Sequence, residues 1–429
     1  MKKPLVITLL VLALLFVLAG IGTVVFFTID NAGTFLEEQR RVSVTGEESK
    51  TLKVEEGPVS LIVDDDAGDV TVIGSDGDTV EIQIVKTGNA PTLSRAEIDL
   101  DNIKYDIKQD DNKITITYKT NKATTNHIDT VDFVIVVPGD TSVDIETGFG
   151  KISVSDITGN ATLVNEFGDV SVEKVKGGLS VISQSGTMKF NSVEAGSQNI
   201  EIDSGFGSIT VEQMSGRHIT VVSSSGNIDL TNVRATGELK TNTDFGDTSY
   251  VNGSSALLSI ETKSGKVSLT KITVRGEIKI LNDFGEIELV QAMAGSYNLH
   301  TNSGSIDIDG AQNQLKADTD FGSISIKNTE AVTLDAHTQS GTISFNGSLG
   351  EGPHTVISEF GQIDLSLPPD SKLDVILETD FGSVSSEIPI TVILDGKLDR
   401  KRQEGTMNGG GDLLTVQTKS GDINITAIK

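Results

Sequence analysis

Apolar and polar residues alternate along most of the chain after residue 51, in short runs bounded by Gly, Asp, Asn and Ser. Alternation of this kind is typical of β-strands that bury one face. One stretch beyond the N-terminal segment indicates a helix, because Ser94-Arg95-Ala96-Glu97 has the spacing of a capping box and predicts a short helix ending near Asn102. The pattern predicts an all-β protein built from many short strands.

One phrase recurs within this pattern: a Phe-Gly or Ser-Gly dipeptide followed by alternating apolar residues, as in Phe206-Gly207-Ser208-Ile209-Thr210-Val211. The phrase occurs fourteen times between Phe149 and Ile425. Its glycines are 18 to 21 residues apart (168 − 150 = 18; 207 − 186 = 21) until a final interval of 39 (421 − 382 = 39). A unit of about 19 residues is too small to bury a face alone, so neighbouring units must stack. The sequence predicts a parallel β-solenoid with about 19 residues per coil.

The residue before the repeated glycine alternates between phenylalanine and serine from residue 167 to residue 360. If one unit forms one coil, Phe and Ser share a column, and serine separates rings too bulky to recur every 4.8 Å or so. If a coil needs two units, the phenylalanines form a column of their own. We favour one unit per coil, because two alternating stretches already close a flattened coil, and we interpret the Phe-Gly pairs as a packing device whose glycine supplies the turn. These structural repeat positions are Phe167 and Gly168, Phe206 and Gly207, Phe245 and Gly246, Phe284 and Gly285, Phe321 and Gly322, and Phe360 and Gly361.

The charge of the residue two positions before the repeated glycine also alternates. Acidic residues stand before phenylalanine, with Gly205 as the exception, at Glu166, Asp244, Asp283, Asp320, Glu359 and Asp380. Neutral or basic residues stand before serine, at Gln184, Ser224, Lys263, Asn302, Gln339 and Lys419. With one unit per coil, like charges are about two strand spacings apart and Lys263 lies between Asp244 and Asp283. We interpret the alternation as a ladder that avoids repulsion; the alternative is a carboxylate stripe that binds divalent cations.

The N-terminal segment differs from the rest of the chain. Met1-Lys2-Lys3 precedes an apolar run over residues 4–29 that is long enough to cross a bilayer core. A cleaved secretory signal is the competing interpretation, but the small-residue cleavage pattern near Ala19 is poor and apolar residues continue beyond it. We expect a single-pass membrane protein with a cytoplasmic N-terminus and the bulk of the chain extracytoplasmic.

The expected organisation follows from these patterns. It consists of a transmembrane anchor at 1–29, a polar stalk at 30–51, an irregular β N-terminal cap at 52–145, regular solenoid repeats at 146–386, and an interrupted coil with a basic, glycine-rich loop and a final capping coil at 387–429. The basic cluster in the last region is Lys397-Leu398-Asp399-Arg400-Lys401-Arg402. We interpret it as an inserted loop; the alternative is a contact with an anionic envelope polymer or with the acidic ladder of a neighbour.

Composition excludes several classes of function. The net charge is −27, which repels nucleic acids, so no nucleic-acid partner is expected. Cysteine is absent, which removes disulfides, thiolate metal sites and cysteine nucleophiles. Tryptophan is also absent and tyrosine is rare, which argues against stacking platforms for sugars or bases.

Candidate chemistry is sparse. The five histidines, at 127, 218, 300, 337 and 354, are scattered without a metal-ligand spacing, and no nucleotide-binding or nucleophile motif is present. The run Asp64-Asp65-Asp66 suggests calcium, but Ser75 stands where an EF-hand loop would place its glutamate, so an acidic turn is the preferred interpretation. No catalytic, cofactor-binding or metal residue is therefore assigned. A polysaccharide-active enzyme would need an acid pair in a cleft away from the regular ladder.

The repeated Ser-Gly phrases, the segment Val131-Asp132-Phe133-Val134-Ile135-Val136-Val137-Pro138, and the closing residues 409–425 resemble the bacterial β-strand-repeat family labelled "putative adhesin". The resemblance covers most of the chain after about Ser43 and implies an exported or membrane-anchored envelope protein without an established catalytic site. We expect a non-enzymatic, membrane-anchored adhesin or envelope scaffold. The alternatives are an accessory sensor or regulator of envelope stress that acts through a membrane protein partner and, third, a polysaccharide-active β-helix enzyme. The expected partners are the membrane, through the N-terminal helix, and an envelope polymer or membrane protein.

Overall fold

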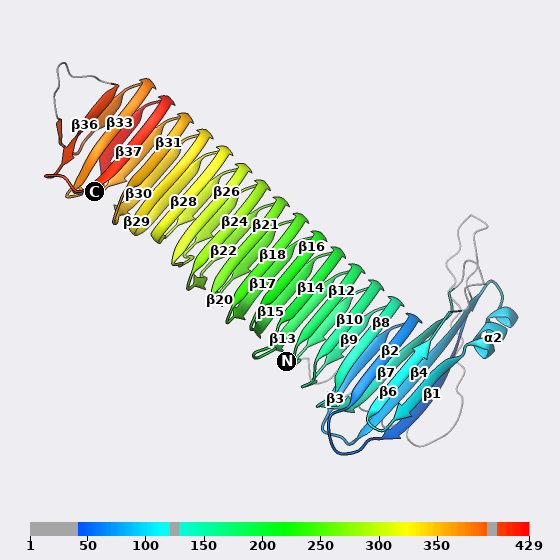
Figure 1. Ribbon diagram of the computed structural model, residues 1–429. Coiled ribbons are helices and arrows are strands. Elements are labelled where there is room, and N and C mark those ends of the chain that lie inside the picture. Colours follow the sequence, from blue (N-terminus) through cyan, green and yellow to red (C-terminus); the bar gives the residue numbers. More distant parts are fainter. Residues whose placement is uncertain (1–41, 121–127, 393–400, 429) are drawn as a thin grey trace, which may run out of the picture.

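The computed structural model describes residues 42–120, 128–392 and 401–428, which form a long rod (Figure 1). The predicted membrane anchor at 1–29 lies outside these residues. Within the described ranges, no helix has the length and apolar character needed to span a bilayer. The rod is an all-β parallel β-solenoid, as the sequence predicted.

Each coil contributes one strand to each of two parallel ladders. Within the repeats, the first sheet contains the strands that end at the Phe or Ser of the phrase, and the second sheet contains the strands that follow the glycine. In spatial order the first sheet consists of β6 (Lys113–Tyr118), β2 (Ser60–Ala67), β8 (Ser142–Phe149), β10 (Ala161–Phe167), β12 (Leu179–Ser185), β14 (Ile200–Phe206), β16 (Ile219–Ser225), β18 (Glu238–Phe245), β21 (Leu257–Ser264), β24 (Glu277–Phe284), β26 (Ser296–Ser303), β28 (Gln312–Phe321), the second half of β29 (Ile324–Ser340), β31 (His354–Phe360), β37 (Asp412–Ser420) and β33 (Leu373–Phe381).

The second sheet runs beside the first along the whole rod. In spatial order it consists of β7 (Thr130–Pro138), β3 (Val70–Ser75), β9 (Ile152–Ser155), β11 (Val170–Glu173), β13 (Met188–Glu194), β15 (Ile209–Gly216), β17 (Ile228–Ala235), β19 (Thr248–Val251), β22 (Val267–Thr270), β25 (Ile287–Val290), β27 (Ile306–Asp309), the first half of β29, β30 (Ile343–Leu349), β32 (Ile363–Leu367), β38 (Ile423–Ala427) and β34 (Val384–Ser386). The short strands β20 (Ser254–Ser255) and β23 (Thr273–Val274) extend this ladder beside the end of β17.

The register confirms that one repeat unit forms one coil. Phe167 pairs with Ser185, and Ser185 pairs with Phe206, so Phe and Ser share a single column. Partners such as Ser225 and Phe245 are 20 residues apart (245 − 225 = 20), close to the predicted period. Most inward residues of both sheets are apolar and form one continuous core along the rod. Stacking thus buries the faces that a single unit could not bury alone.

The N-terminal end is covered by antiparallel strands. β5 (Tyr105–Asp110) pairs with β6, β4 (Thr79–Ala90) pairs with β7, and β1 (Val42–Lys53) pairs with β4. The helix α2 (Leu93–Asn102) packs on β4 and β1 beyond them (Figure 1). The capping-box prediction was wrong in detail, because Thr92 is the N-cap and its side chain makes no capping hydrogen bond. These strands protect the open edge of the first coil from pairing with other chains.

At the C-terminal end, the spatial order of the last two coils is the reverse of their order in the sequence. β37 and β38 are last in the sequence, but β37 pairs with β31 on one side and with β33 on the other. The earlier coil formed by β33 and β34 is therefore outermost, and β36 (Arg402–Met407) covers it as an antiparallel strand, with β35 (Ile390–Val392) paired to β36. The expected final capping coil at the end of the chain is thus corrected: the last phrase fills the gap in the ladder, because that position offers strand partners on both sides.

Candidate functional site

Eight phenylalanines form an exposed row along the edge where the first sheet turns into the second. This aromatic column consists of Phe149, Phe167, Phe206, Phe245, Phe284, Phe321, Phe360 and Phe381. Their exposed fractions range from 46% at Phe167 to 76% at Phe381. The interpretation of the Phe-Gly phrase as a packing device is therefore corrected for its phenylalanine rings: these side chains lie in solvent and not in the core.

Strand parity explains why the rings point outward. In β10, Leu163 and Asn165 face inward, so alternation alone would bury Phe167. The chain turns at Gly168, however, and the turn leaves both Glu166 and Phe167 outside. This exposure was not predicted from the sequence, because the alternation of inward and outward side chains along a strand does not continue through a turn. The signal available in the sequence was the position of phenylalanine directly before an obligatory turn glycine.

The main chain of the corner joins each coil to the next. The Gly168 N–H donates to the Ser185 carbonyl at 2.9 Å, and the Gly186 N–H donates to the Phe206 carbonyl at 3.0 Å. A β-carbon on Gly168 would lie 2.0 Å from the Gly150 carbonyl oxygen, and the residue has a φ of +142°. The glycines predicted from the repeat thus serve the turn and also a close approach between coils.

A buried polar row lies just inside the aromatic column, three residues before each glycine. Its members are Asp65, Thr147, Asn165, Ser183, Ser204, Ser223, Thr243, Thr262, Asn282, Thr301, Thr319, Thr338, Ser358, Thr379 and Thr418. Several donate to the turn glycines, as when Thr301 Oγ1 bonds the Gly285 carbonyl at 3.1 Å. These members satisfy carbonyl groups that the turn leaves inside the coil. Other members have buried hydroxyls with no hydrogen-bond partner among the described residues, namely Thr147, Ser183, Ser223, Thr243 and Thr262.

Four of the six acidic residues beside the rings, Asp244, Asp283, Asp320 and Glu359, are bonded to the next coil. Lys263 Nζ lies 2.7 Å from Asp244 Oδ1, and Lys419 Nζ lies 2.9 Å from Glu359 Oε1. Neutral amides serve the central units instead: Asn302 Nδ2 donates to Asp283 Oδ1 at 3.2 Å and Gln339 Nε2 donates to Asp320 Oδ1 at 3.0 Å. These bonds agree with the interpretation of the charge alternation as a ladder that avoids repulsion. In their pairs with Asn302 and Gln339, Asp283 and Asp320 meet a neutral amide and not a cation.

The last ring of the column carries a cation. Lys401 Nζ lies 5.5 Å from the centroid of the Phe381 ring, within the range of a cation–π interaction. The same ammonium donates to the Asp380 carbonyl at 2.8 Å. Arg402, its neighbour, pairs with Glu378 and Glu404. The two described residues of the predicted basic cluster therefore contact their own chain, and residues 393–400 of the region lie outside the described part.

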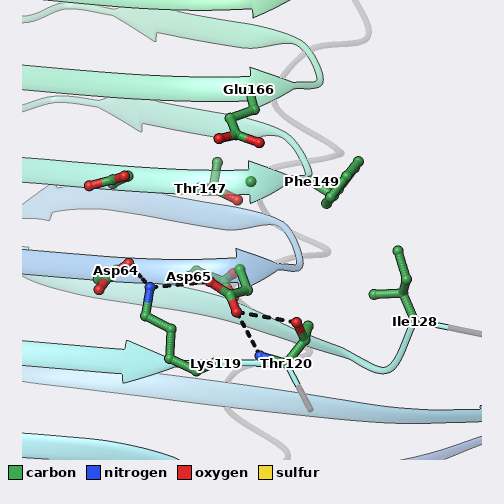
Figure 2. A pocket seen from close by; sticks show the side chains of 11 residues that line it. Asp64, Asp65, Lys119, Thr120, Ile128, Thr147, Phe149 and Glu166 are labelled. Atoms are coloured by element: carbon green, nitrogen blue, oxygen red, sulfur yellow. Dashed lines mark hydrogen bonds and ion pairs between the residues drawn. The ribbon is translucent and has the colours of Figure 1, made fainter. Parts of the chain in front are cut away.

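The first ring of the column, Phe149, lines a small pocket at the N-terminal cap. Phe149 and Phe167 stack with centroids 5.1 Å apart and planes 10° apart. Figure 2 shows Phe149 at the end of β8, Thr147 on the same strand and Asp65 on the neighbouring strand β2. Lys119 Nζ bridges Asp64 at 2.5 Å and Asp66 at 3.1 Å, so both carboxylates are ion-paired. Both lie within strand β2, which corrects the expected acidic turn.

Asp65 differs from its two neighbours because it is buried in the polar row. It is 1% exposed, its Oδ1 accepts from the Ala67 N–H at 3.1 Å, and its Oδ2 has no partner among the described residues. Burial raises the pKa of Asp65 to about 8, and nearby carboxylates add to the rise. The hydrogen bond from the Ala67 N–H acts in the opposite direction, but its effect is smaller than that of burial. Burial also acts on Asp66, but hydrogen bonds from Thr120 and Lys119 outweigh it and lower the pKa of that group.

The four histidines in the described part of the chain do not assemble a metal site. His300 Nδ1 and His337 Nδ1 lie 3.0 Å and 2.8 Å from the two carboxylate oxygens of Asp318, on the outer face of the first sheet. His354 is buried, and burial lowers its pKa. No group of three or more His, Asp or Glu side chains in the described part of the chain is placed to hold a metal ion.

Fold and surface together define a class: a parallel β-solenoid repeat protein that displays an aromatic row on one edge. The family model described as Toastrack DUF4097 matches residues 59–252 and 251–426. The chain therefore belongs to the Toastrack DUF4097 family, and the resemblance to a β-strand-repeat family is confirmed.

Two solved structures are similar to the chain. A "putative cell adhesion protein" from Clostridium sporogenes ATCC 15579 is 9% identical, with 90% of this chain and 100% of that chain covered and a TM-score of 0.21. A "putative adhesin" from Bacteroides fragilis NCTC 9343 is 12% identical, with 57% and 96% covered and a TM-score of 0.32. Among curated proteins, none matches the chain in sequence.

Proposed function

We propose that this protein is a non-enzymatic, membrane-anchored solenoid outside the cytoplasm, and that its aromatic column is an adhesin-like contact surface. The observation that carries the proposal is the exposure of eight phenylalanines at one register position. Contiguous exposed apolar groups rimmed by polar residues are typical of interaction sites. The rings are not needed to close the coils, because main-chain hydrogen bonds do so at the same positions and serine replaces phenylalanine in alternate coils.

The anchor and the orientation of the chain belong to the same proposal. The apolar run at 4–29 would hold the protein in a membrane, and Lys2 and Lys3 favour a cytoplasmic N-terminus. A rod raised from a membrane would then present the column along its length. An envelope polymer or a membrane protein could meet the same surface, in which case the rod would act as an envelope scaffold.

Replacing five central rings by serine is the test of this function. The variant carries Phe206→Ser, Phe245→Ser, Phe284→Ser, Phe321→Ser and Phe360→Ser, and serine is the residue that neighbouring coils carry in this column. We expect cells that display the full chain to lose cell–cell attachment under flow by at least roughly tenfold, because many weak contacts act together. Each single change should alter the free energy of unfolding by less than about 0.5 kcal/mol, since the rings are exposed.

A matched control removes exposed apolar side chains outside the column. Ile182 and Leu257 are 49% and 48% exposed on the first sheet, so Ile182→Ser with Leu257→Ser should leave attachment unchanged. Equal attachment by the five-ring variant and the wild type, at equal display, would reject the column as the contact surface. Loss of a co-purifying membrane protein in the same variant, without loss of attachment, would favour the sensor alternative.

A further inference from the structure

The aromatic column is uniform in its rings but not in its charge. Around Phe245 and Phe360 the adjacent carboxylates, Asp244 and Glu359, are paired with lysines of the next coil. Around Phe284 and Phe321 the corresponding carboxylates bond to neutral amides. The two central units therefore combine an exposed ring with a carboxylate whose hydrogen-bond partner is neutral. Lys263, which stands one coil before Asp283, pairs with Asp244 instead.

The C-terminal end of the column shows what such a unit accommodates. Lys401 approaches the face of Phe381 and bonds the main chain of Asp380, so an acid-Phe-Gly unit of this repeat already receives a lysine side chain. An ammonium or guanidinium over an aromatic ring is attracted by the ring quadrupole, and a nearby carboxylate adds to the attraction. Phe284 and Phe321 are 62% exposed, which leaves their faces accessible to a cation from another chain.

The spacing of the two central units constrains the ligand further. Phe284 and Phe321 both pair with Ser303, so they are two coils apart, or about 9.6 Å at the usual strand spacing. A polypeptide in the polyproline II conformation has three residues per turn and advances about 9.3 Å per turn. Side chains at every third residue therefore recur on one side at nearly the spacing of the rings. In a β-strand, same-side residues recur at about 6.6 Å and do not match.

We propose, on the basis of the contact surface proposed above, that the central units bind a basic polypeptide segment in polyproline II conformation, with lysine or arginine at every third residue. One cationic side chain lies over Phe284 beside Asp283, and the next lies over Phe321 beside Asp320. Ser303 separates the rings and leaves room for the ligand backbone to pass between them. The partner is thus an unfolded basic region of a protein, because such chains populate this conformation readily.

Binding of a synthetic peptide with a Lys-Pro-Pro repeat to the full-length protein in detergent micelles tests the proposal. The comparison peptide has the same composition with its lysines clustered at one end. We expect the repeat peptide to bind at least about threefold more tightly, and its binding to weaken as salt is added. Equal binding of the two peptides would overturn the proposed spacing and conformation.

Matched variants of the protein locate the site. Phe284→Ser with Phe321→Ser should weaken binding of the repeat peptide roughly five- to thirtyfold, from two exposed cation–π contacts. Phe245→Ser with Phe360→Ser should weaken it less than about threefold, because their carboxylates already have lysine partners. Equal losses in the two double variants would overturn the assignment to the central units and indicate a merely apolar surface.

A gain-of-function variant completes the test. In the Lys263→Gln variant, Asp244 beside Phe245 would have a neutral amide as its partner, as Asp320 has in Gln339. The repeat peptide should therefore bind about two- to threefold more tightly to this variant than to the wild type. Weaker or unchanged binding by this variant would count against the proposal. If attachment of cells needs the column but neither peptide binds, this inference fails while the proposed contact function stands; if neither attachment nor binding needs the column, both fail.

Discussion

Replacing Gly285 by alanine is expected to destabilise the protein by at least about 3 kcal/mol, although the residue lies at the surface edge of the rod. A β-carbon at this position would lie 2.0 Å from the Gly265 carbonyl oxygen and 2.7 Å from its carbon. Both atoms belong to the main chain of the previous coil and are held in the ladder by the Gly265 N–H bond to the Phe284 carbonyl. The φ of +152° adds backbone strain for any residue with a side chain. Relief would require the two coils to separate.

Equilibrium unfolding in urea measures this effect. Gly139→Ala is the matched control, because its β-carbon would meet the Ser75 carbonyl oxygen at an ordinary 3.6 Å, and it should cost less than about 1 kcal/mol. A Gly285→Ala protein as stable as the control would show that the coils do not approach as closely as described. The same test applies at Gly322, whose β-carbon would lie 1.9 Å from the Gly304 carbonyl oxygen.

Replacing Asp65 by asparagine is expected to stabilise the protein at pH 8 by a few kcal/mol. Burial raises the pKa of this carboxyl from 3.8 to about 8, so the folded protein retains a proton that the unfolded chain releases. An asparagine occupies the same position of the polar row in β10, where Asn165 Nδ2 donates to the Gly150 and Gly168 carbonyls at 3.0 Å. The substitution thus removes the unfavourable charge and introduces a residue type that the repeat already uses.

The sign of the pH dependence follows from the raised pKa. Below about pH 4 the carboxyl is protonated in both states, and Asp65 imposes no charge penalty on the folded protein. As pH rises from about 4 to about 8, the unfolded chain loses the proton first, and the contribution of Asp65 to stability falls; above that it is constant. The difference in unfolding free energy between Asp65→Asn and the wild type should therefore grow from pH 4 to pH 8 and then level off.

An exposed carboxylate in the same strand provides the control for this experiment. Asp64→Asn removes one charge from the pair with Lys119, and a surface pair contributes less than about 1 kcal/mol. Its stability difference from the wild type should vary little between pH 5 and pH 8. A flat difference for Asp65→Asn over the same range would mean that Asp65 is ionised in the folded protein.

Much of the architecture could be predicted because it depends on local and periodic signals. The phrase interval gave the length of a coil, and the alternation of Phe and Ser gave one unit per coil, which the pairing of Phe167 with Ser185 confirms. The position of Lys263 next to Asp244 of the neighbouring coil was also predicted from the order of residues alone. The position of β37 could not be predicted, because its ladder partners, β31 and β33, are set by contacts between segments distant in sequence.

The candidate site depended on the tertiary structure to a greater degree. The sequence identified the phenylalanines but assigned them to packing, because a strand period does not show on which side of a corner a ring falls. The contact of Lys401 with Phe381 brings together residues that are 20 positions apart in the sequence (401 − 381 = 20), and no local pattern marks it. Asp65 was grouped with Asp64 and Asp66 as an acidic turn, although its alternate position in β2 buries it.

By itself, then, the amino-acid sequence determined the repeat, the glycine turns and the charge alternation, since each depends on residues within one unit or on the spacing between units. Only the tertiary structure decided which side chains face solvent at the corner, which carboxylates receive a cation, and which coil lies at the end of the rod. These features depend on where the chain turns and on which strands become neighbours, and both are set by burial and hydrogen bonding over the whole stack.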